Sequence, residues 1–242
     1  MNKIFKKDNS IILDEQTHKY ILKGKEEIKF VSVTTCISEY FEIFDKEKIA
    51  YKLVTYNPKY AGKTVEELIG EWEAAANFGT AVHKEIEDYI NHKNTPTIDK
   101  AIAGINWLNK YLLKSKFDLF SEVIIYCENL KIAGTIDLIV YDKLNKVYHI
   151  LDWKTSKSVS SESYKMKKGN KPETEDLLDS KFNHYALQLS LYRYLLEKNY
   201  DITIDDQIIV HIDNDSVHGY ITPYLLKNIE SILNNHKEQN VI

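Results

Sequence analysis

Apolar and polar positions follow different periods along the first part of the 242-residue chain. Residues 10–33 show the short alternating runs that are typical of two or three strands, with a polar turn at KGKEE. Helical patterns follow within residues 35–57. Thr64 and, three residues later, Glu67 form a capping-box sequence, which predicts that the next helix begins there.

The rest of the chain alternates between helical and strand patterns. Gly79 is expected to interrupt the helix that begins at Thr64, and a helical pattern then continues through Ile90. The other predicted elements are a helix over 101–115, strands over 119–127, 131–141 and 146–154, a helix over 183–199, a strand over 206–213 and a helix over 223–236. This order predicts the α/β class, and the length suits one globular domain.

The sequence AGTIDLIVYDKLNKVYHILDWKTSK predicts a β-hairpin that carries charges inside apolar runs. With a two- or four-residue loop centred on Leu144 and Asn145, Asp137 lies directly opposite Asp152. The Cβ atoms of opposed residues are about 5 Å apart, so two carboxylates at such positions can come into direct contact and repel each other, and a fold must share a proton or bind a cation between them. Lys154 points to the same face as Asp152 because side chains alternate along a strand.

The charged end of this hairpin has two interpretations. It could be a solvated surface, but both strands are apolar on both faces, as buried strands are. The alternative is a site for Mg²⁺ or Mn²⁺, which prefer carboxylate oxygens together with water and substrate phosphate. Lys154 would then suit a phosphate oxygen or the attacking water. This combination favours hydrolysis of a phosphodiester bond.

A second candidate is the helical sequence GTAVHKEIE. His83 and Glu87 are four residues apart and therefore share one helix face, while Gly79 leaves space one turn earlier. A lone helical histidine is more often exposed or bound within the protein than a metal ligand. A metal site elsewhere favours the second interpretation, because a neutral imidazole can complete the coordination of the ion.

Two further patterns have both structural and functional interpretations. In HYALQLSLYRY, His184, Gln188 and Tyr192 share one helix face, which indicates either the polar flank of a core helix or a ridge that orients phosphate. The segment 155–180 is rich in Ser, Lys and Glu and is expected to be weakly structured. Its basic run contains candidate contacts to a phosphate backbone, or simply solvated side chains: Lys165, Lys167, Lys168 and Lys171.

Composition restricts the class of protein. The formal net charge of −4 provides no general basic field for nucleic acid, so any such partner needs a local patch or metal ions. The two cysteines, Cys36 and Cys127, imply no disulfide framework or metal finger. The N-terminal residues lack the apolar region of a signal peptide, and no apolar run is long enough to span a bilayer. We therefore expect a soluble cytoplasmic protein with no membrane partner.

Four short motifs in a fixed order give the sequence a family resemblance. They are Gly79–His83–Glu87, Gly134–Asp137, Asp152–Trp153–Lys154–Thr155 and Gln188–Tyr192. This order resembles the PD-(D/E)XK nucleases, and in particular the RecB-type exonuclease domain, which includes the mitochondrial genome-maintenance exonuclease and phage-encoded relatives. The resemblance implies a restriction-endonuclease-like core, in which helices flank a central mixed β-sheet, with an N-terminal extension of strands and helices.

The resemblance covers residues 72–200 and implies one nuclease domain over 1–242. Residues 1–71 would supply N-terminal strands and helices, and 201–242 a closing strand and helix. Some relatives carry four cysteines for an iron–sulfur cluster, and with only two cysteines this chain is expected to lack that cluster.

The resemblance also implies roles for individual residues. His83, Asp137, Asp152 and the main-chain carbonyl of Trp153 would bind Mg²⁺ or Mn²⁺. Lys154 would act in catalysis with the two aspartates, by positioning or activating the attacking water and stabilising the charged phosphate. The remaining residues that would support the site or contact DNA are Gln188, Tyr192, Glu87, Lys165, Lys167 and Lys168. Glu122, on a preceding strand, is a further candidate carboxylate.

The function that these expectations favour is a metal-dependent DNA exonuclease that acts on single-stranded or end-containing DNA in recombination, repair or replication. A structure-specific endonuclease and a non-catalytic nucleic-acid-binding module on the same fold are the alternatives. A glycosidase is disfavoured, because its two carboxyl groups must be at least about 5 Å apart and it has no use for the lysine. Cleavage polarity and oligomeric state are left open.

Overall fold

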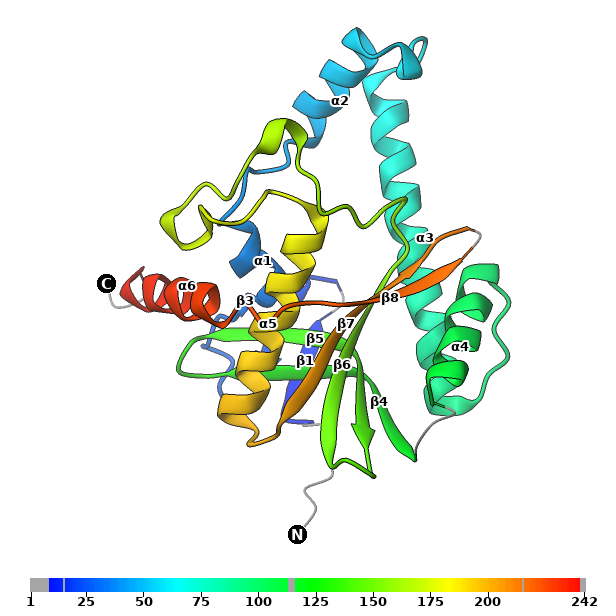
Figure 1. Ribbon diagram of the computed structural model, residues 1–242. Coiled ribbons are helices and arrows are strands. Elements are labelled where there is room, and N and C mark those ends of the chain that lie inside the picture. Colours follow the sequence, from blue (N-terminus) through cyan, green and yellow to red (C-terminus); the bar gives the residue numbers. More distant parts are fainter. Residues whose placement is uncertain (1–8, 15, 113–115, 215, 240–242) are drawn as a thin grey trace.

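The computed structural model describes residues 9–14, 16–112, 116–214 and 216–239 (Figure 1). A small hairpin is formed by β1 (Ile11–Asp14) and β2 (Lys19–Leu22). The strands of the main sheet are β3 (Val31–Ser32), β4 (Phe117–Cys127), β5 (Ile132–Asp142), β6 (Val147–Lys154), β7 (Ile204–Ile212) and β8 (Val217–Ile221). The α-helices are α1 (Val33–Ser38), α2 (Lys46–Tyr56), α3 (Val65–His92), α4 (Asp99–Leu112), α5 (Lys181–Asn199) and α6 (Leu226–Gln239).

Most predicted elements are confirmed to within a few residues at their ends, one prediction was wrong and one strand was not predicted; residues 113–115, the end of the helix predicted over 101–115, lie outside the described residues. Gly79 does not interrupt a helix, because α3 continues without a break from Val65 to His92. The capping box that Thr64 and Glu67 were predicted to form at its start is confirmed. The edge strand β8 was not predicted, because its five residues include a glycine and it shows only weak alternation.

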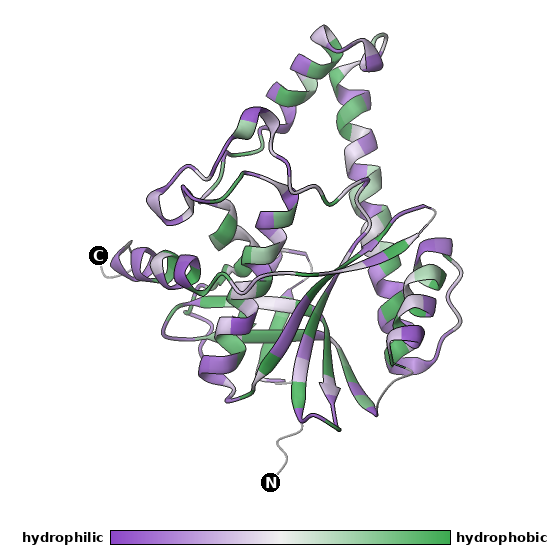
Figure 2. Cartoon of the chain, viewed as in Figure 1, coloured by the Kyte–Doolittle hydropathy of each residue, from purple (hydrophilic) through white to green (hydrophobic). Residues whose placement is uncertain are grey.

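The main sheet is mixed and is covered by helices on both faces, as the resemblance implies. Pairing is parallel between β3 and β5 and between β6 and β7, and antiparallel elsewhere. Helices α1, α5 and α6 contribute to the apolar core on one face, and α3 and α4 to the core on the other (Figure 1). Figure 2 shows the apolar residues concentrated in the strands of this sheet. Burial on both faces is therefore confirmed for the charged hairpin β5–β6.

One edge of β5 contains a stretch that no neighbouring strand of the described chain pairs with. Strand β4 pairs with the whole of β5, so β3 and β6 must share the opposite edge. The β6 ladder covers Leu138 to Asp142 of β5, and the short β3 pairs only with Ile132 and Ala133. Residues 134–137 of β5 therefore lie on an edge that neither strand covers, and this gap contains Gly134 and Asp137.

The segment that links β6 to α5 was expected to be weakly structured, and its helices are two single 3₁₀ turns, Tyr164–Met166 and Pro172–Thr174. It lacks long elements, but main-chain groups of Tyr40 and Phe41 hold it in place. Thr174 is buried and its hydroxyl donates to the Tyr40 carbonyl at 2.9 Å, while the Asn170 side chain donates to the Phe41 carbonyl at 2.8 Å. Short polar side chains thus order this segment where apolar periodicity gives no signal.

None of the helices in the described ranges is long and apolar enough to cross a membrane. Cys36 is buried in α1 and Cys127 lies half-buried at the end of β4, and both are free thiols. The predicted lack of an iron–sulfur cluster stays a prediction.

Gly79 and Gly70 lie in the same helix but have different surroundings. A Cβ atom at Gly79 would lie 2.8 Å from Thr155 Oγ1, whereas one at Gly70 would meet nothing within 4 Å. We expect Gly70→Ala to raise the free energy of unfolding by about 1 kcal/mol through helix propensity, and Gly79→Ala to lack this gain because Thr155 must move. Equilibrium urea denaturation measures both. In a Thr155→Ala background, Gly79→Ala should recover the gain, and failure to do so would contradict the close contact.

Candidate active site

The hairpin register predicted from the sequence is confirmed. Asp142 pairs with Val147 across a four-residue loop, and the ladder continues as far as Leu138 opposite Leu151. The next pair in this register is Asp137 and Asp152, so the two carboxylates lie opposite each other where the ladder ends.

The Asp137 side chain makes a hydrogen bond to β6 where the main-chain ladder between β5 and β6 has ended. Its Oδ2 atom accepts a hydrogen bond from the main-chain N–H of Trp153 at 2.8 Å. The same oxygen lies 3.5 Å from Nδ1 of His83, which projects from α3. The strand end, the neighbouring strand and the helix therefore meet at one carboxylate.

Glu122 extends the pair of aspartates into a row across three strands. The β4–β5 register pairs the neighbours of Glu122 with those of Asp137, so Glu122 lies opposite Asp137 on the other edge of β5. Glu122 has a left-handed backbone, with φ of 48°, which is uncommon for a residue other than glycine. One donor atom from each of His83, Glu122 and Asp137 lies within 4.8 Å of the other two. We call Glu122, Asp137 and Asp152 the carboxylate row.

Asp152 and Lys154 form a buried ion pair. Lys154 Nζ lies 2.5 Å from Asp152 Oδ2, and the Asp152 side chain is only 4% exposed. Burial raises the pKa of Asp152 above its ordinary value, Lys154 opposes this shift and Asp137 adds to it. Burial alone would lower the pKa of Lys154, but the carboxylates of Asp152 and Asp137 outweigh it and raise that pKa. Lys154 is therefore protonated at neutral pH.

Helix α5 supports the carboxylate row from one face of the sheet. The Gln188 side-chain amide donates to Asp152 Oδ1 at 3.2 Å, which leaves Oδ2 for Lys154. Tyr192 is buried, and burial raises its pKa well above the ordinary value. A Cβ atom at position 134 would lie 2.6 Å from the Tyr192 ring, so Gly134 gives this ring its place beside β5. Two of the motif residues thus pack against each other.

Other candidates from the sequence lie away from the carboxylate row. Glu87 contacts Lys84 and Asn91 on the surface of its own helix. His184, the first polar residue of the α5 face, contacts Asp179 at 2.8 Å.

The three lysines of the linking segment that were predicted to contact DNA are exposed, and their contacts lie outside the carboxylate row. Lys167 forms an ion pair with Glu42, the Lys165 ammonium lies over the Tyr164 ring at 5.3 Å, and Lys168 forms a β-bridge with Leu178. Their predicted role in DNA binding stays a prediction.

Two tyrosines near the site were missed by the sequence analysis. The Lys154 ammonium lies 4.6 Å from the centre of the Tyr185 ring, an orientation that stabilises a buried cation. The Tyr20 hydroxyl, from the N-terminal hairpin, hydrogen-bonds with Thr135 Oγ1 at 3.0 Å. Burial raises the pKa of Tyr20, the bond to Thr135 opposes the shift, and Glu122 adds to it. Tyr185 could have been found from its position three residues before Gln188, but no sequence signal connects Tyr20 to the site.

Comparisons with known proteins give one family match. A sequence model of the PD-(D/E)XK nuclease superfamily matches residues 54–217, which include all four motifs. Among solved structures, SSO0001 is 14% identical, with 85% of this chain and 75% of that chain covered and a TM-score of 0.36. A protein of Eubacterium rectale, provisionally named as an exonuclease, is 12% identical, with 88% and 79% covered and a TM-score of 0.41. No curated protein matches the chain significantly.

The raised pKa of Asp152 predicts how stability depends on pH. Native Asp152 stays protonated at pH values above about 3.9, where the unfolded chain has already lost this proton. The free energy of unfolding therefore falls as pH rises from the unfolded pKa to the native pKa of Asp152. Asparagine carries no proton to lose, so the free energy of unfolding of Asp152→Asn minus that of wild type should increase over this pH range. Above the native pKa of Asp152 the difference should stay constant. Denaturation titrations in EDTA from acidic to neutral pH measure this difference.

Asp14 provides a control of opposite sign. Hydrogen bonds from Thr17 and Gln16 lower its pKa, so ionised Asp14 stabilises the fold. Asp14→Asn should therefore lose stability relative to wild type as pH rises. The same trend in Asp152→Asn would show that Lys154 outweighs burial, and would contradict the prediction.

Proposed function

The chain belongs to the PD-(D/E)XK nuclease superfamily, and on this basis we propose that it is a metal-dependent DNA exonuclease that hydrolyses phosphodiester bonds. The observation that carries the proposal is the convergence of Asp137, Asp152 and Lys154 at the open end of a buried hairpin, with His83 3.5 Å from Asp137. A non-catalytic module would not need to retain this costly set of buried charges.

The donor atoms at the site suit a hard divalent cation. His83, Glu122 and Asp137 can each supply one ligand atom from within 4.8 Å of the others, Asp152 lies opposite Asp137, and the Trp153 carbonyl would be a further ligand. Carboxylate and carbonyl oxygens suit Mg²⁺, and an added imidazole is compatible with Mn²⁺. When bound, such an ion would withdraw charge from the scissile phosphate and increase the acidity of nearby water.

Lys154 acts by its charge in this proposal. Asp152 and Asp137 raise its pKa, so it is an ammonium at neutral pH and cannot serve as a general base. Its ammonium would donate hydrogen bonds to the attacking water and to a phosphate oxygen as negative charge develops there. The Tyr185 ring and Asp152 restrict the ammonium to one side of the site.

Gln188 and Tyr192 act as positioning residues. Gln188 fixes one oxygen of Asp152, and Tyr192 fills the space beside Gly134 at the gap in the strand edge. The geometry of the carboxylate row then depends on packed side chains of α5.

Exposed aromatic side chains support a single-stranded or end-containing DNA substrate. Helix α2 and the first part of α3 project beyond the sheet (Figure 1). Exposed rings on these helices, beside them and on the linking segment are those of Phe44, Tyr51, Tyr56, Phe78 and Tyr164. Unpaired bases stack on such rings without sequence preference, whereas duplex bases are already stacked. Lys165 and Lys168 would add phosphate contacts. A structure-specific endonuclease would use the same chemistry, and labelled 5′ and 3′ ends on single and double strands distinguish the two.

We expect Lys154→Ala to lower the cleavage rate about 100- to 1000-fold while DNA binding and Mn²⁺ binding persist, because the ammonium stabilises charge that develops in the transition state. Labelled single-stranded DNA incubated with Mg²⁺, Mn²⁺ or EDTA measures cleavage, and fluorescence anisotropy measures binding. Lys157→Ala, an exposed lysine after the same strand, is the matched control. Cleavage by Lys154→Ala at a near wild-type rate would remove Lys154 from the mechanism.

We expect His83→Ala to weaken Mn²⁺ affinity at least tenfold and to regain part of its activity at high Mn²⁺, because water can replace the imidazole ligand. Isothermal titration calorimetry measures the affinity. His92→Ala, an exposed histidine at the end of the same helix, is the matched control. Equal Mn²⁺ affinities for His83→Ala and wild type would exclude His83 as a ligand.

A further inference from the structure

A β-bulge lies at the opposite end of β6 from the carboxylate row. Tyr148 pairs with Ile204 of β7, but Ile150 pairs with Gln207, so β7 has one extra residue in this interval. Asp205 and Asp206 therefore both lie opposite His149. Consecutive residues of a regular strand point to opposite faces, and a bulge redirects one of them.

His149 is a buried base whose Nδ1 atom has no hydrogen-bond partner in the described part of the chain. This atom lies 3.5 Å from Oδ2 of Asp206. One donor atom from each of His149, Asp205 and Asp206 lies within 4.8 Å of the other two. A buried, unsatisfied ring nitrogen beside two carboxylates is costly unless a further group completes it.

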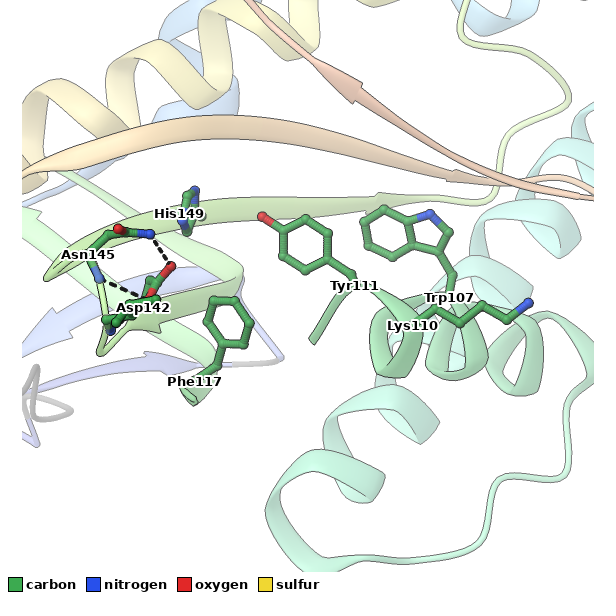
Figure 3. Close-up of a pocket in the computed structure, with 8 residues that line it drawn as sticks. Trp107, Lys110, Tyr111, Phe117, Asp142, Asn145 and His149 are labelled. Carbon is green, nitrogen blue, oxygen red and sulfur yellow. Dashed lines mark hydrogen bonds between the residues drawn. The ribbon is translucent and has the colours of Figure 1, made fainter. Parts of the chain in front are cut away.

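An open cleft adjoins this cluster. It has a volume of about 560 Å³, and Figure 3 shows Trp107, Tyr111, Phe117 and His149 along its wall. The Tyr111 ring stands edge-on to the His149 ring at 6.5 Å. Burial, followed by the nearby acidic residues led by Asp206, raises the pKa of Tyr111 to about 12. The cleft thus gives solvent access to the buried His149 ring.

We propose that His149, Asp205 and Asp206 form a second metal site, for Zn²⁺ or a similar first-row transition-metal ion. Two ligands that bind one tetrahedral zinc ion at about 2.0–2.1 Å are roughly 3.4 Å apart, and His149 Nδ1 and Asp206 Oδ2 are 3.5 Å apart. An imidazole together with two carboxylates favours such an ion over Mg²⁺ or Ca²⁺, which prefer oxygen ligands alone. The ion would keep at least one position open toward the cleft.

The site is distinct from the carboxylate row in both face and ligand type. His149 is three residues before Asp152 on β6, so the two side chains leave the strand on opposite faces. The exposed Asp205 side chain can rotate toward the ion, whereas buried His149 is already in place. A bound ion would join β6 to β7 at the bulge, where the strand ladder is interrupted.

Zinc titration of the folded protein tests this proposal. In an Asp137→Asn background, which removes a ligand of the carboxylate row, we expect one Zn²⁺ equivalent by calorimetry. Addition of Asp206→Asn, a nearly isosteric change at a half-exposed side chain, should weaken this binding at least tenfold. Addition of Asp213→Asn, just beyond the far end of β7, should leave it unchanged. Equal Zn²⁺ affinity with and without Asp206→Asn would overturn the proposal.

A measurement on the wild-type protein tests the proposal even if the variants do not fold. Crystals soaked in Zn²⁺ should give an anomalous difference peak about 2.0–2.2 Å from His149 Nδ1 and from a carboxylate oxygen of Asp206. A peak at the carboxylate row with none beside His149 would show that His149 and Asp206 form an ordinary ion pair, and would contradict the second site.

Discussion

The structure depends on a set of carboxylates that are held in register across β4, β5 and β6. Asp137 and Asp152 lie opposite each other, Asp152 is almost fully buried, and the cation at contact distance among the described residues is Lys154. Desolvated charges are stable in a fold only when ion pairs and hydrogen bonds compensate them. Lys154, the Trp153 N–H and the Gln188 amide provide that compensation from three directions. The ion pair with Lys154 alone would leave other carboxylate oxygens of Asp137 and Asp152 without hydrogen bonds. The Trp153 N–H and the Gln188 amide are therefore needed to stabilise the two carboxylates.

The glycines of the motifs have steric roles. Helix α3 brings His83 to the sheet, and its close approach at Gly79 places the Thr155 side chain where a Cβ atom would stand. Gly134 has the corresponding role on the other side, because the Tyr192 ring occupies the space of its absent side chain. Each glycine therefore sets the distance between the sheet and one of the two helices that carry residues of the site. A glycine inside α3 costs about 1 kcal/mol of helix propensity, which tertiary packing outweighs, and the helix continues through it.

The sequence was sufficient for the parts of the site that depend on local pattern. The polar turn after Tyr141 and the strand period place Asp137 opposite Asp152, and both follow from local residues. Glu122 needed a second register, that of β4 with β5, together with an unusual φ value that no residue pattern encodes. Tyr20 reaches the site from a hairpin more than 100 residues before Asp137, so only the packed fold shows its position. Glu87 is one turn of α3 beyond His83 and pairs with Lys84, and its predicted supporting role stays a prediction.

Contacts at the other end of β6 and β7 restrict where the bulge between these strands can lie. From Ile150 to Lys154 the parallel ladder is regular, so Asp152 and Lys154 share the face toward α5. The chain beyond Lys154 is held as it leaves the sheet. Lys100 donates to the carbonyls of Thr155 and Ile212 at 3.2 and 3.1 Å.

His211 adds a second contact at this exit, since its Nε2 atom lies 2.6 Å from the Ser156 carbonyl. An extra residue of β7 after Gln207 would turn the following β7 side chains to the opposite face and carry His211 away from Ser156. The extra residue of β7 lies before Gln207, beside His149, and Asp205 and Asp206 lie together at that end of the sheet.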